Sequence, residues 1–216
     1  MEGFRMVWDD MPLLLKGAWV TIEVAILSII FATIIGLIFG LFRVSQSRIL
    51  QGIAKVYISI IRGTPLLVQI IFFTYGLMPL ILAEPLPEIV YAVIVLSLNA
   101  GAYLCEVFRA GIESIDKGQR EAGRAIGFTH SQTLRYIILP QAIKRMIPTF
   151  MNQFIITFKD TSLLATIAVA ELTYTAQTLY AINYQSFAYL AAIAIMYWIM
   201  ITFLTYIANL LERKLI

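Results

Sequence analysis

The fold class is decided by residues 17–42, which read GAWVTIEVAILSIIFATIIGLIFGLF. Glu23 is the only ionisable residue in this run. A bilayer core is about 30 Å thick, and roughly 20 apolar residues of α-helix are enough to cross it. The run therefore predicts a transmembrane helix. The residues before it lack a basic segment and a small-residue cleavage site, so a cleaved signal peptide is not expected.

The rest of the chain extends this interpretation to a polytopic membrane protein. The 216 residues are 60% hydrophobic and 13% charged, and the mean hydropathy is +0.84. A soluble domain of this size needs a more polar surface. No internal repeat or linker divides the chain, so we expect one all-α transmembrane domain over residues 1–216. Further spans are predicted at 53–83, 87–110, 143–170 and 187–211, with helix breakers inside the first and third of these.

The basic residues set the predicted orientation. Of the sixteen Lys and Arg residues, twelve border the spans on one side. Only Arg5 and Lys16 lie on the other side. Basic residues concentrate in cytoplasmic loops of membrane proteins. We therefore expect five spans, an N-terminus outside and a C-terminus in the cytosol.

Several classes of function are disfavoured. The net charge of +3 does not indicate nucleic-acid binding, because the basic residues lie in loops between apolar spans. Cys105 and His130 are the only residues of their types, so no ordinary zinc site is expected. The chain lacks a Gly-rich phosphate loop ending in Lys-Ser/Thr. With no nucleophile–base pair either, no catalytic residue and no metal site are predicted.

The longest polar segment, about 111–142, predicts two short helices around a tight turn. Residues 119–126 form the first helix, and Gly127 is suited to end it with a positive φ. Ser131 is the expected N-cap of the second helix, which Pro140 is expected to bend or end. On amphipathicity alone, this loop could also be a solvated segment that merely sets topology.

The spacing within the loop favours a specific interpretation. Glu121-Ala122, Gly127, Ile137 and Leu139-Pro140 keep every interval of the EAA loop. The chain thereby resembles permease subunits of binding-protein-dependent ABC importers. Gly123 replaces the second alanine, a small-for-small exchange. Residues 62–69 (RGTPLLVQ) and 159–164 (KDTSLL) resemble segments of the polar-amino-acid branch of that family.

The resemblance implies that the helix around Glu121 is a coupling helix held in a groove of a cytosolic ATPase. The residues implied in this contact are Arg120, Glu121, Ala122, Gly123, Ala125 and Gly127. An alternative for Glu121 is a local pair with Arg124, three residues further on.

The resemblance also implies the assembly and its location. Two ATPase chains, a second permease chain (identical or homologous) and an extracellular solute-binding protein are the implied partners, with an amino acid as substrate. ATP and Mg are used by the ATPase, and no cofactor is expected on this chain. The implied location is the cell inner membrane.

Ionisable residues inside spans are costly and are usually functional or paired. Glu23 and Asp160 are expected at similar depths in the outer half of the membrane. Two carboxylates in one cavity repel each other unless a cation joins them. This pattern predicts a basic amino acid (arginine, lysine or histidine) as substrate. The alternatives are a local pair of Asp160 with Lys159 and a pair of Glu23 with a base of another span.

Asp160-Thr161-Ser162-Leu163 predicts a helix interruption followed by a new helix N-terminus. Such a terminus attracts anions, so these residues are candidates for binding the substrate α-carboxylate. In the alternative, the two hydroxyls bond back to their own helix.

Arg62-Gly63-Thr64-Pro65 predicts a second helix break, because Pro65 cannot donate a backbone hydrogen bond. Gly63, Thr64 and Pro65 are predicted to form a hinge or gate. Arg62 is expected to pair with Glu106 or to reach the cytosolic interface.

Arg62 and Asn99 complete the candidate substrate-binding residues, although helix–helix hydrogen bonding explains Asn99 equally well. Two other functions were weighed against the importer permease. One is an ion-coupled channel or secondary transporter, and the other is a structural membrane subunit. The EAA spacing disfavours the former, and the helix breaks disfavour the latter.

Overall fold

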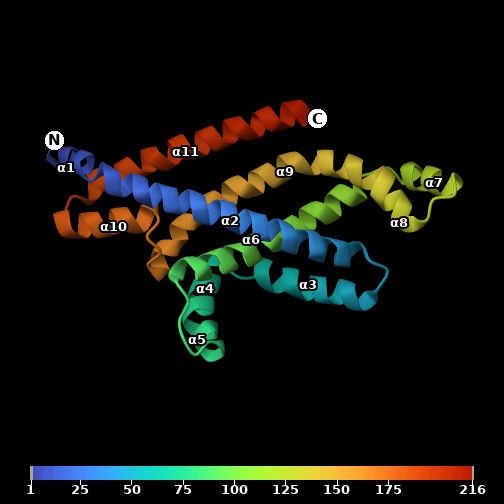
Figure 1. Ribbon diagram of the computed structural model, residues 1–216, viewed down its shortest axis with the longest axis horizontal. Coiled ribbons are helices and arrows are strands. Elements are labelled where there is room, and N and C mark those ends of the chain that lie inside the picture. The colour runs from blue at the N-terminus through green and yellow to red at the C-terminus, as the bar shows by residue number, and fades with distance from the viewer. Residues whose placement is uncertain (1, 216) are drawn as a thin grey trace.

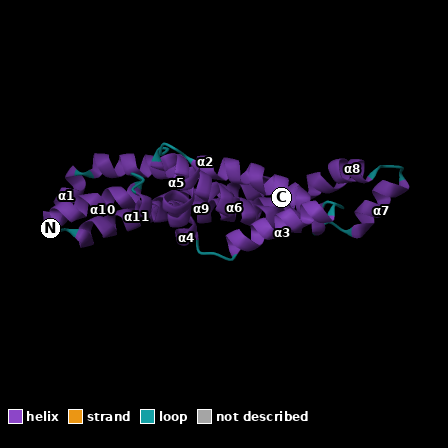
Figure 2. Ribbon diagram, turned by 90° about the horizontal axis from the view of Figure 1, so that it is seen from below, coloured by secondary structure: helices purple, strands orange, loops and turns teal. Residues whose placement is uncertain are grey.

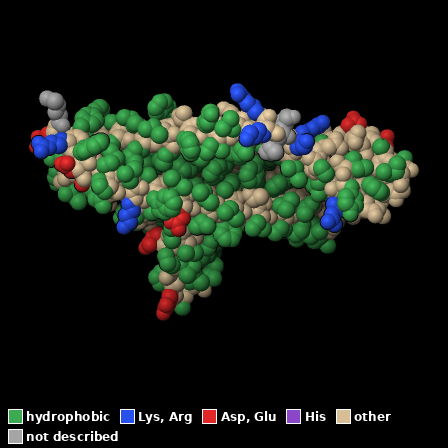
Figure 3. All heavy atoms as spheres, turned by 45° about the horizontal axis from the view of Figure 1, so that its top comes forward, with side chains coloured by type: hydrophobic (Ala, Val, Ile, Leu, Met, Phe, Trp, Pro, Cys, Tyr) green, Lys and Arg blue, Asp and Glu red, His purple; other side chains and the backbone are tan. Residues whose placement is uncertain are grey.

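The computed structural model describes residues 2–215, which are mostly helical, with short connecting loops, and contain no strand. Figures 1 and 2 show an elongated bundle whose long helices follow its long axis. These helices are α2 (Met11–Val44), α6 (Glu88–Glu113), α9 (Leu139–Asp160) and α11 (Ser186–Leu215). Hydrophobic side chains cover most of the face seen in Figure 3, as a bilayer environment requires.

Three helices within the described residues are long and apolar enough to cross a membrane: α2, α6 and α11. A bent pair of helices makes a fourth if it is one span. The all-helical membrane fold predicted from the sequence is confirmed. The number of five spans and the orientation of the termini stay predictions.

The two central helices, α2 and α6, approach closely because glycine lines their contact. Pro12 lies in the first turn of α2, where its missing N–H costs no hydrogen bond. A Cβ atom on Gly36 would lie 2.7 Å from Leu104 Cβ and 3.2 Å from both Cys105 N and Gly101 O. The backbones therefore meet at a distance that only glycine permits.

This contact makes a testable prediction about stability. Gly36→Ala is expected to destabilise the protein by roughly 1–3 kcal/mol, because backbone atoms of α6 cannot yield. Gly52→Ala is the matched control, since nothing lies within 4 Å of a Cβ there. Helix propensity alone should leave that variant unchanged or stabilise it by up to about 1 kcal/mol. Thermal unfolding in detergent, followed by circular dichroism, measures both; equal midpoints would contradict the tight contact.

The predicted break in the second span is present, and it is sharper than a kink. α3 (Arg48–Arg62) ends at Gly63, and α4 (Leu66–Ile71) starts after Pro65. A π-helical segment, η1 (Phe72–Leu77), and α5 (Met78–Ile81) continue from α4. The two halves are bent by 103°, and Figure 1 shows α4 and α5 projecting sideways from the bundle. The span predicted at 53–83 is therefore not one straight crossing helix.

The segment predicted as an external loop before the last span is helical in the structure. α10 (Leu172–Asn183) follows the short 3-10 helix η3 (Thr161–Ile167). Glu171 is fully buried, and its carboxylate accepts hydrogen bonds from Thr173 N (2.9 Å) and Tyr174 N (2.7 Å). This N-cap starts α10, and the hydroxyl of Tyr197 also donates to it at 2.8 Å. At the N-terminal end of the bundle, α1 (Glu2–Asp9) packs against α11.

The polar loop contains the two predicted short helices, with corrected ends. α7 (Lys117–Ala125) is followed by Gly127 at φ 86°, which confirms the left-handed terminator. α8 (His130–Thr133) is capped by Thr129, so the predicted N-cap at Ser131 is wrong. Thr129 Oγ1 accepts from Gln132 N, and the Gln132 side chain accepts from Thr129 N, which forms a capping box.

Pro140 does not end the helix that contains it, so that part of the prediction is wrong, whereas a bend at Pro140 stays a prediction. A π-helical segment, η2 (Leu134–Ile138), precedes α9, and Pro140 lies in the first turn of α9. The same arrangement precedes Pro79 in α5. A wider turn relieves the clash of the proline ring with an upstream carbonyl, so the chain continues as helix.

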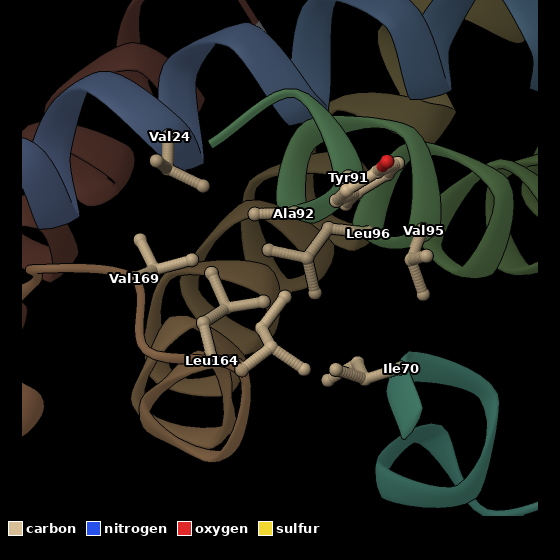
Figure 4. Packing of buried hydrophobic residues seen from close by; sticks show 9 residues of the cluster. Val24, Ile70, Tyr91, Ala92, Val95, Leu96, Leu164 and Val169 are labelled. Atoms are coloured by element: carbon tan, nitrogen blue, oxygen red, sulfur yellow. The ribbon is translucent and has the colours of Figure 1, made fainter. Parts of the chain in front are cut away.

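An apolar cluster fixes the base of the sideways projection to the bundle. Figure 4 shows Ile70 of α4 facing Leu164 of η3, with Val95 and Leu96 of α6 beside them. All four side chains are buried. This packing holds the helix break next to α6 and η3, and so positions the residues around Pro65.

Candidate functional site

The helix break borders a pocket of about 380 Å³. Its lining comes from the start of α4, from α6 and from α9: Thr64, Pro65, Leu66, Asn99, Tyr103, Gln153, Ile156 and Asp160. Sequence reasoning placed Asn99 and Asp160 among the substrate-binding residues, and Thr64 and Pro65 in a hinge or gate. The structure brings these four residues to one pocket, although they come from three separate segments.

Gln69 holds the two sides of the helix break together. Its Nε2 donates to Ile61 O at 2.7 Å, to Thr64 O at 3.0 Å and to Thr64 Oγ1 at 2.7 Å. Its Oε1 accepts a hydrogen bond from Asn99 Nδ2 at 2.9 Å. One amide therefore satisfies the Ile61 carbonyl that Pro65 leaves free, binds Thr64 as well, and ties the break to α6.

The role of Gln69 predicts a large effect on stability. Gln69→Leu is expected to destabilise the protein, because it removes the hydrogen bonds that Gln69 makes to Ile61 and Thr64, and a typical hydrogen bond contributes about 0.5–1.5 kcal/mol. Gln177→Leu in α10 is the control, since no hydrogen bond of the Gln177 side chain is found in the described structure. The measurement is the midpoint of thermal unfolding in detergent. Similar midpoints for the two variants would show that water, rather than Gln69, satisfies the break.

Asp160 places a carboxylate in the pocket without a cationic partner. The side chain is half-buried, and it makes no ion pair with any described residue. The local pair with Lys159 is therefore not formed. Asn99 and Gln153, both buried, add amide groups to the same pocket. The arrangement suits a ligand with a positive group and further hydrogen-bonding groups.

Arg62 does not pair with Glu106, which corrects one of the two expectations for it. Glu106 instead binds Arg43 (Nε–Oε1, 3.2 Å) and Arg109 (Nη2–Oε2, 2.8 Å). The Arg62 guanidinium lies over the ring of Tyr103, 5.1 Å from its centre. Since Tyr103 lines the pocket, Arg62 is a cationic group next to it, where an α-carboxylate would be attracted.

The helix N-terminus predicted at Asp160-Thr161-Ser162 is wrong. The chain runs from α9 into η3 without an interruption. Thr161 Oγ1 donates to Phe158 O at 2.7 Å, and Ser162 Oγ donates to Lys159 O at 2.8 Å. The hydroxyls thus bond back to their own helix. Leu163 packs against the apolar cluster of Figure 4, and contact of these residues with substrate stays a prediction.

Glu23 lies apart from Asp160. It is exposed on α2 and lines a separate, mostly apolar groove with Leu27, Phe31 and Val93. Within the described chain, Glu23 and Asp160 line different pockets, so the two carboxylates are not brought to one site. A role for Glu23 in substrate binding stays a prediction.

The predicted coupling residues lie on α7, and Gly127 follows it in the turn, at one end of the bundle (Figure 1). Glu121, Ala122 and Ala125 are exposed, whereas Gly123 is buried against Thr133. Glu121 forms no ion pair within the described part of the chain, so the local pair with Arg124 is not formed. α7 therefore presents one free face and packs by the other.

Sequence reasoning assigned no role to Gln69 or Tyr103, whereas Gln153 was a candidate for lining the translocation path, with helix–helix hydrogen bonding as the alternative. A signal for Gln69 was available, since it is a polar residue in an apolar run, four positions after the Pro65 that leaves carbonyls unpaired. No comparable signal exists for Tyr103, whose partner Arg62 comes from another helix.

The comparison with known proteins decides the family. The family described as "Binding-protein-dependent transport system inner membrane component" matches residues 32–216. The chain belongs to this family. It is thus a membrane component of such a transport system, with several apolar helices in the inner membrane, and the resemblance of its EAA loop is confirmed.

Relatives of this permease match it over nearly their whole length. The glutamine transport system permease protein GlnP of Escherichia coli (strain K12) is 39% identical over 209 residues, or 97% of this chain and 95% of the relative. The L-cystine transport system permease protein TcyB of Bacillus subtilis (strain 168) is 46% identical over 222 residues, or 99% and 93%. A solved amino acid ABC transporter with histidines matches with a TM-score of 0.92 and 34% identity, over 98% of both chains.

Proposed function

We propose that this permease imports an amino acid with a basic side chain, driven by ATP that a separate subunit hydrolyses. The observation that carries the proposal is the half-buried carboxylate of Asp160, which lies in the pocket at the helix break without a cationic partner. An ammonium, guanidinium or imidazolium group of the substrate would supply the missing charge.

The other end of an amino acid finds complementary groups near the same pocket. Arg62, over the Tyr103 ring, is a cation for the α-carboxylate, and the amides of Asn99 and Gln153 are further hydrogen-bonding groups. The similar solved structure is that of an amino acid ABC transporter with histidines, and histidine belongs to the class of basic amino acids proposed here.

A second candidate is a neutral polar amino acid. The named relatives GlnP and TcyB transport glutamine and L-cystine, and the pocket contains two amides that suit such side chains. In that case Asp160 would hold the α-ammonium group, which every amino acid carries. Basic and neutral substrates therefore differ in what Asp160 binds.

In the proposed assembly, two permease chains line the pathway and two ATPase chains dock on the α7 helices. An extracellular binding protein delivers the substrate. α7 suits this role because its buried face joins it to α8 and η2, and a helix that moves as a body transmits a displacement. The hinge is formed by Gly63, Thr64 and Pro65. The hydrogen bonds of the Gln69 side chain across the break form or are lost as the hinge moves.

Uptake by the complete transporter in proteoliposomes tests the proposal. ATP-dependent accumulation of radiolabelled arginine, lysine and histidine should exceed that of glutamine and cystine. Accumulation without ATP would contradict an ATP-driven importer. ATP-driven uptake confined to neutral amino acids would leave the importer in place but reject the basic substrate.

A further inference from the structure

A second pocket, of about 290 Å³, lies where α2 ends and α7 and α8 begin. Arg43 comes from the end of α2, Arg120 and Arg124 come from α7, and His130 and Thr133 come from α8. Glu113 is the one acidic residue in its lining. The pocket thus gathers basic groups from three helices that are distant in the sequence.

The positive charge of this pocket is only partly neutralised. Glu113 is already bound by Arg109 (2.5 Å), and Arg43 binds Glu106 (3.2 Å). Arg120 donates to the carbonyl of Ile112 at 3.2 Å, which leaves its charge unbalanced. Arg124 has no ion pair with any residue that the structure describes. At least two guanidinium groups therefore face the pocket without a carboxylate.

A buried hydroxyl in the same pocket also lacks a partner. Thr133 is 4% exposed, and its Oγ1 has no hydrogen bond in the described structure. Such a buried group destabilises the protein if it stays unpaired. Thr133 lines the pocket beside the two free guanidinium groups, so one anionic oxygen-rich ligand would balance both charges and would accept a hydrogen bond from the Thr133 hydroxyl once that side chain turns toward the pocket.

The position along α2 indicates which anion is available. The apolar run of α2 ends at Phe42, so Arg43 marks the polar boundary of the bilayer. Phosphate groups of anionic lipids lie at that level, and basic pockets between helices bind them. Arginine also binds phosphate oxygens through paired N–H groups.

We propose that this pocket binds a phosphate group, held by Arg120, Arg124 and Thr133 with support from Arg43. The group is supplied by an anionic phospholipid headgroup or by free phosphate. The bound phosphate joins α7 to the ends of α2 and α6. It therefore stiffens the link between the proposed coupling helix and the membrane helices, a role beyond the transport function itself.

Thermal unfolding of the purified permease–ATPase complex in detergent tests this site. Three additions are compared: dioctanoyl phosphatidylglycerol, inorganic phosphate, and dioctanoylglycerol, which has the same acyl chains without phosphate. A raised unfolding temperature with phosphatidylglycerol alone identifies a lipid headgroup, and a rise with inorganic phosphate as well identifies the phosphate group by itself. No rise with either, or an equal rise with dioctanoylglycerol, would overturn the proposal.

Two variants separate the pocket from general surface charge. Arg124→Gln and Thr133→Val should each raise the half-saturating concentration about tenfold, as expected for one charge-assisted hydrogen bond. Lys117→Gln is the matched control, because it removes one charge from an exposed site on α7 outside the pocket lining. If Lys117→Gln weakens binding as much as Arg124→Gln does, diffuse attraction explains the effect and the site is rejected. Thr133→Val changes no charge, so normal binding by that variant would also reject it.

Discussion

Replacing Asp160 by Asn is expected to lower ATP-driven uptake of arginine or lysine at least tenfold. Asn keeps the size of the side chain and one acceptor oxygen but removes the charge. A hydrogen bond to a charged group is worth roughly 1.5–3 kcal/mol, which corresponds to about 10- to 150-fold in binding. Since no described residue forms an ion pair with Asp160, the substrate would lose the only carboxylate in this pocket.

The comparison between substrates is the decisive part of this experiment. If Asp160 binds the basic side chain, uptake of a neutral amino acid should fall much less than that of arginine. If Asp160 binds the α-ammonium group, uptake of both classes should fall equally, and the proposal of a basic substrate would be rejected. Initial rates in proteoliposomes at several substrate concentrations give the two ratios.

Two controls keep this result interpretable. Asp9→Asn makes the same chemical change at an exposed position near the N-terminus and should leave uptake unchanged. The amount of permease that co-purifies with the ATPase shows that Asp160→Asn assembles. Loss of uptake with loss of assembly would indicate a folding defect, and Asp160→Glu, which restores the charge, should then fail to recover uptake.

The break at Pro65 illustrates what local chemistry predicts well. Pro65 and Gly63 predicted the interruption, because a missing donor has the same consequence in every fold. The bend of 103° was not predictable, since it depends on the packing of Ile70 against α6 and η3. The missing donor at Pro65 was predicted, whereas the hydrogen bonds of Gln69 across the break were not.

The capping of α8 shows a signal that was present and misjudged. Thr129 and Ser131 are both good N-cap residues, and the sequence prediction chose Ser131. Only Thr129 has a glutamine three residues later, which completes a capping box. The N-cap preference of Thr and Ser also led to the wrong prediction of a helix N-terminus at Thr161 and Ser162. Their hydroxyls instead donate to carbonyls one turn back in their own helix.

The separation of Glu23 from Asp160 marks a limit of one-dimensional reasoning. Counting residues along a span gives depth, because each residue adds about 1.5 Å. It does not give the direction in which a side chain points, which depends on how the helices rotate and pack. Asn99 and Asp160 share a pocket for that reason, although sequence reasoning paired Asp160 with Glu23.

Reversing the charge at Glu121 is expected to uncouple the transporter. Glu121 is exposed on α7 and has no ionic partner in the described chain, so it is free to pair with a base on the ATPase. Truncating one side of a buried interfacial charge pair costs about 2–5 kcal/mol or more. Glu121→Arg also places two like charges together. ATP-driven uptake and co-purification of the ATPase should therefore both fall at least tenfold.

The fold of the permease itself should survive this change, because the Glu121 side chain is exposed and Gly123 provides the inward contact of α7. An unaltered unfolding midpoint of the isolated permease would establish that point. Glu212→Arg makes the same charge reversal near the end of α11 and should leave assembly intact. If Glu121→Arg assembles and transports normally, α7 does not dock through this carboxylate. If assembly persists while uptake is lost, Glu121 acts in transmitting the motion rather than in holding the ATPase.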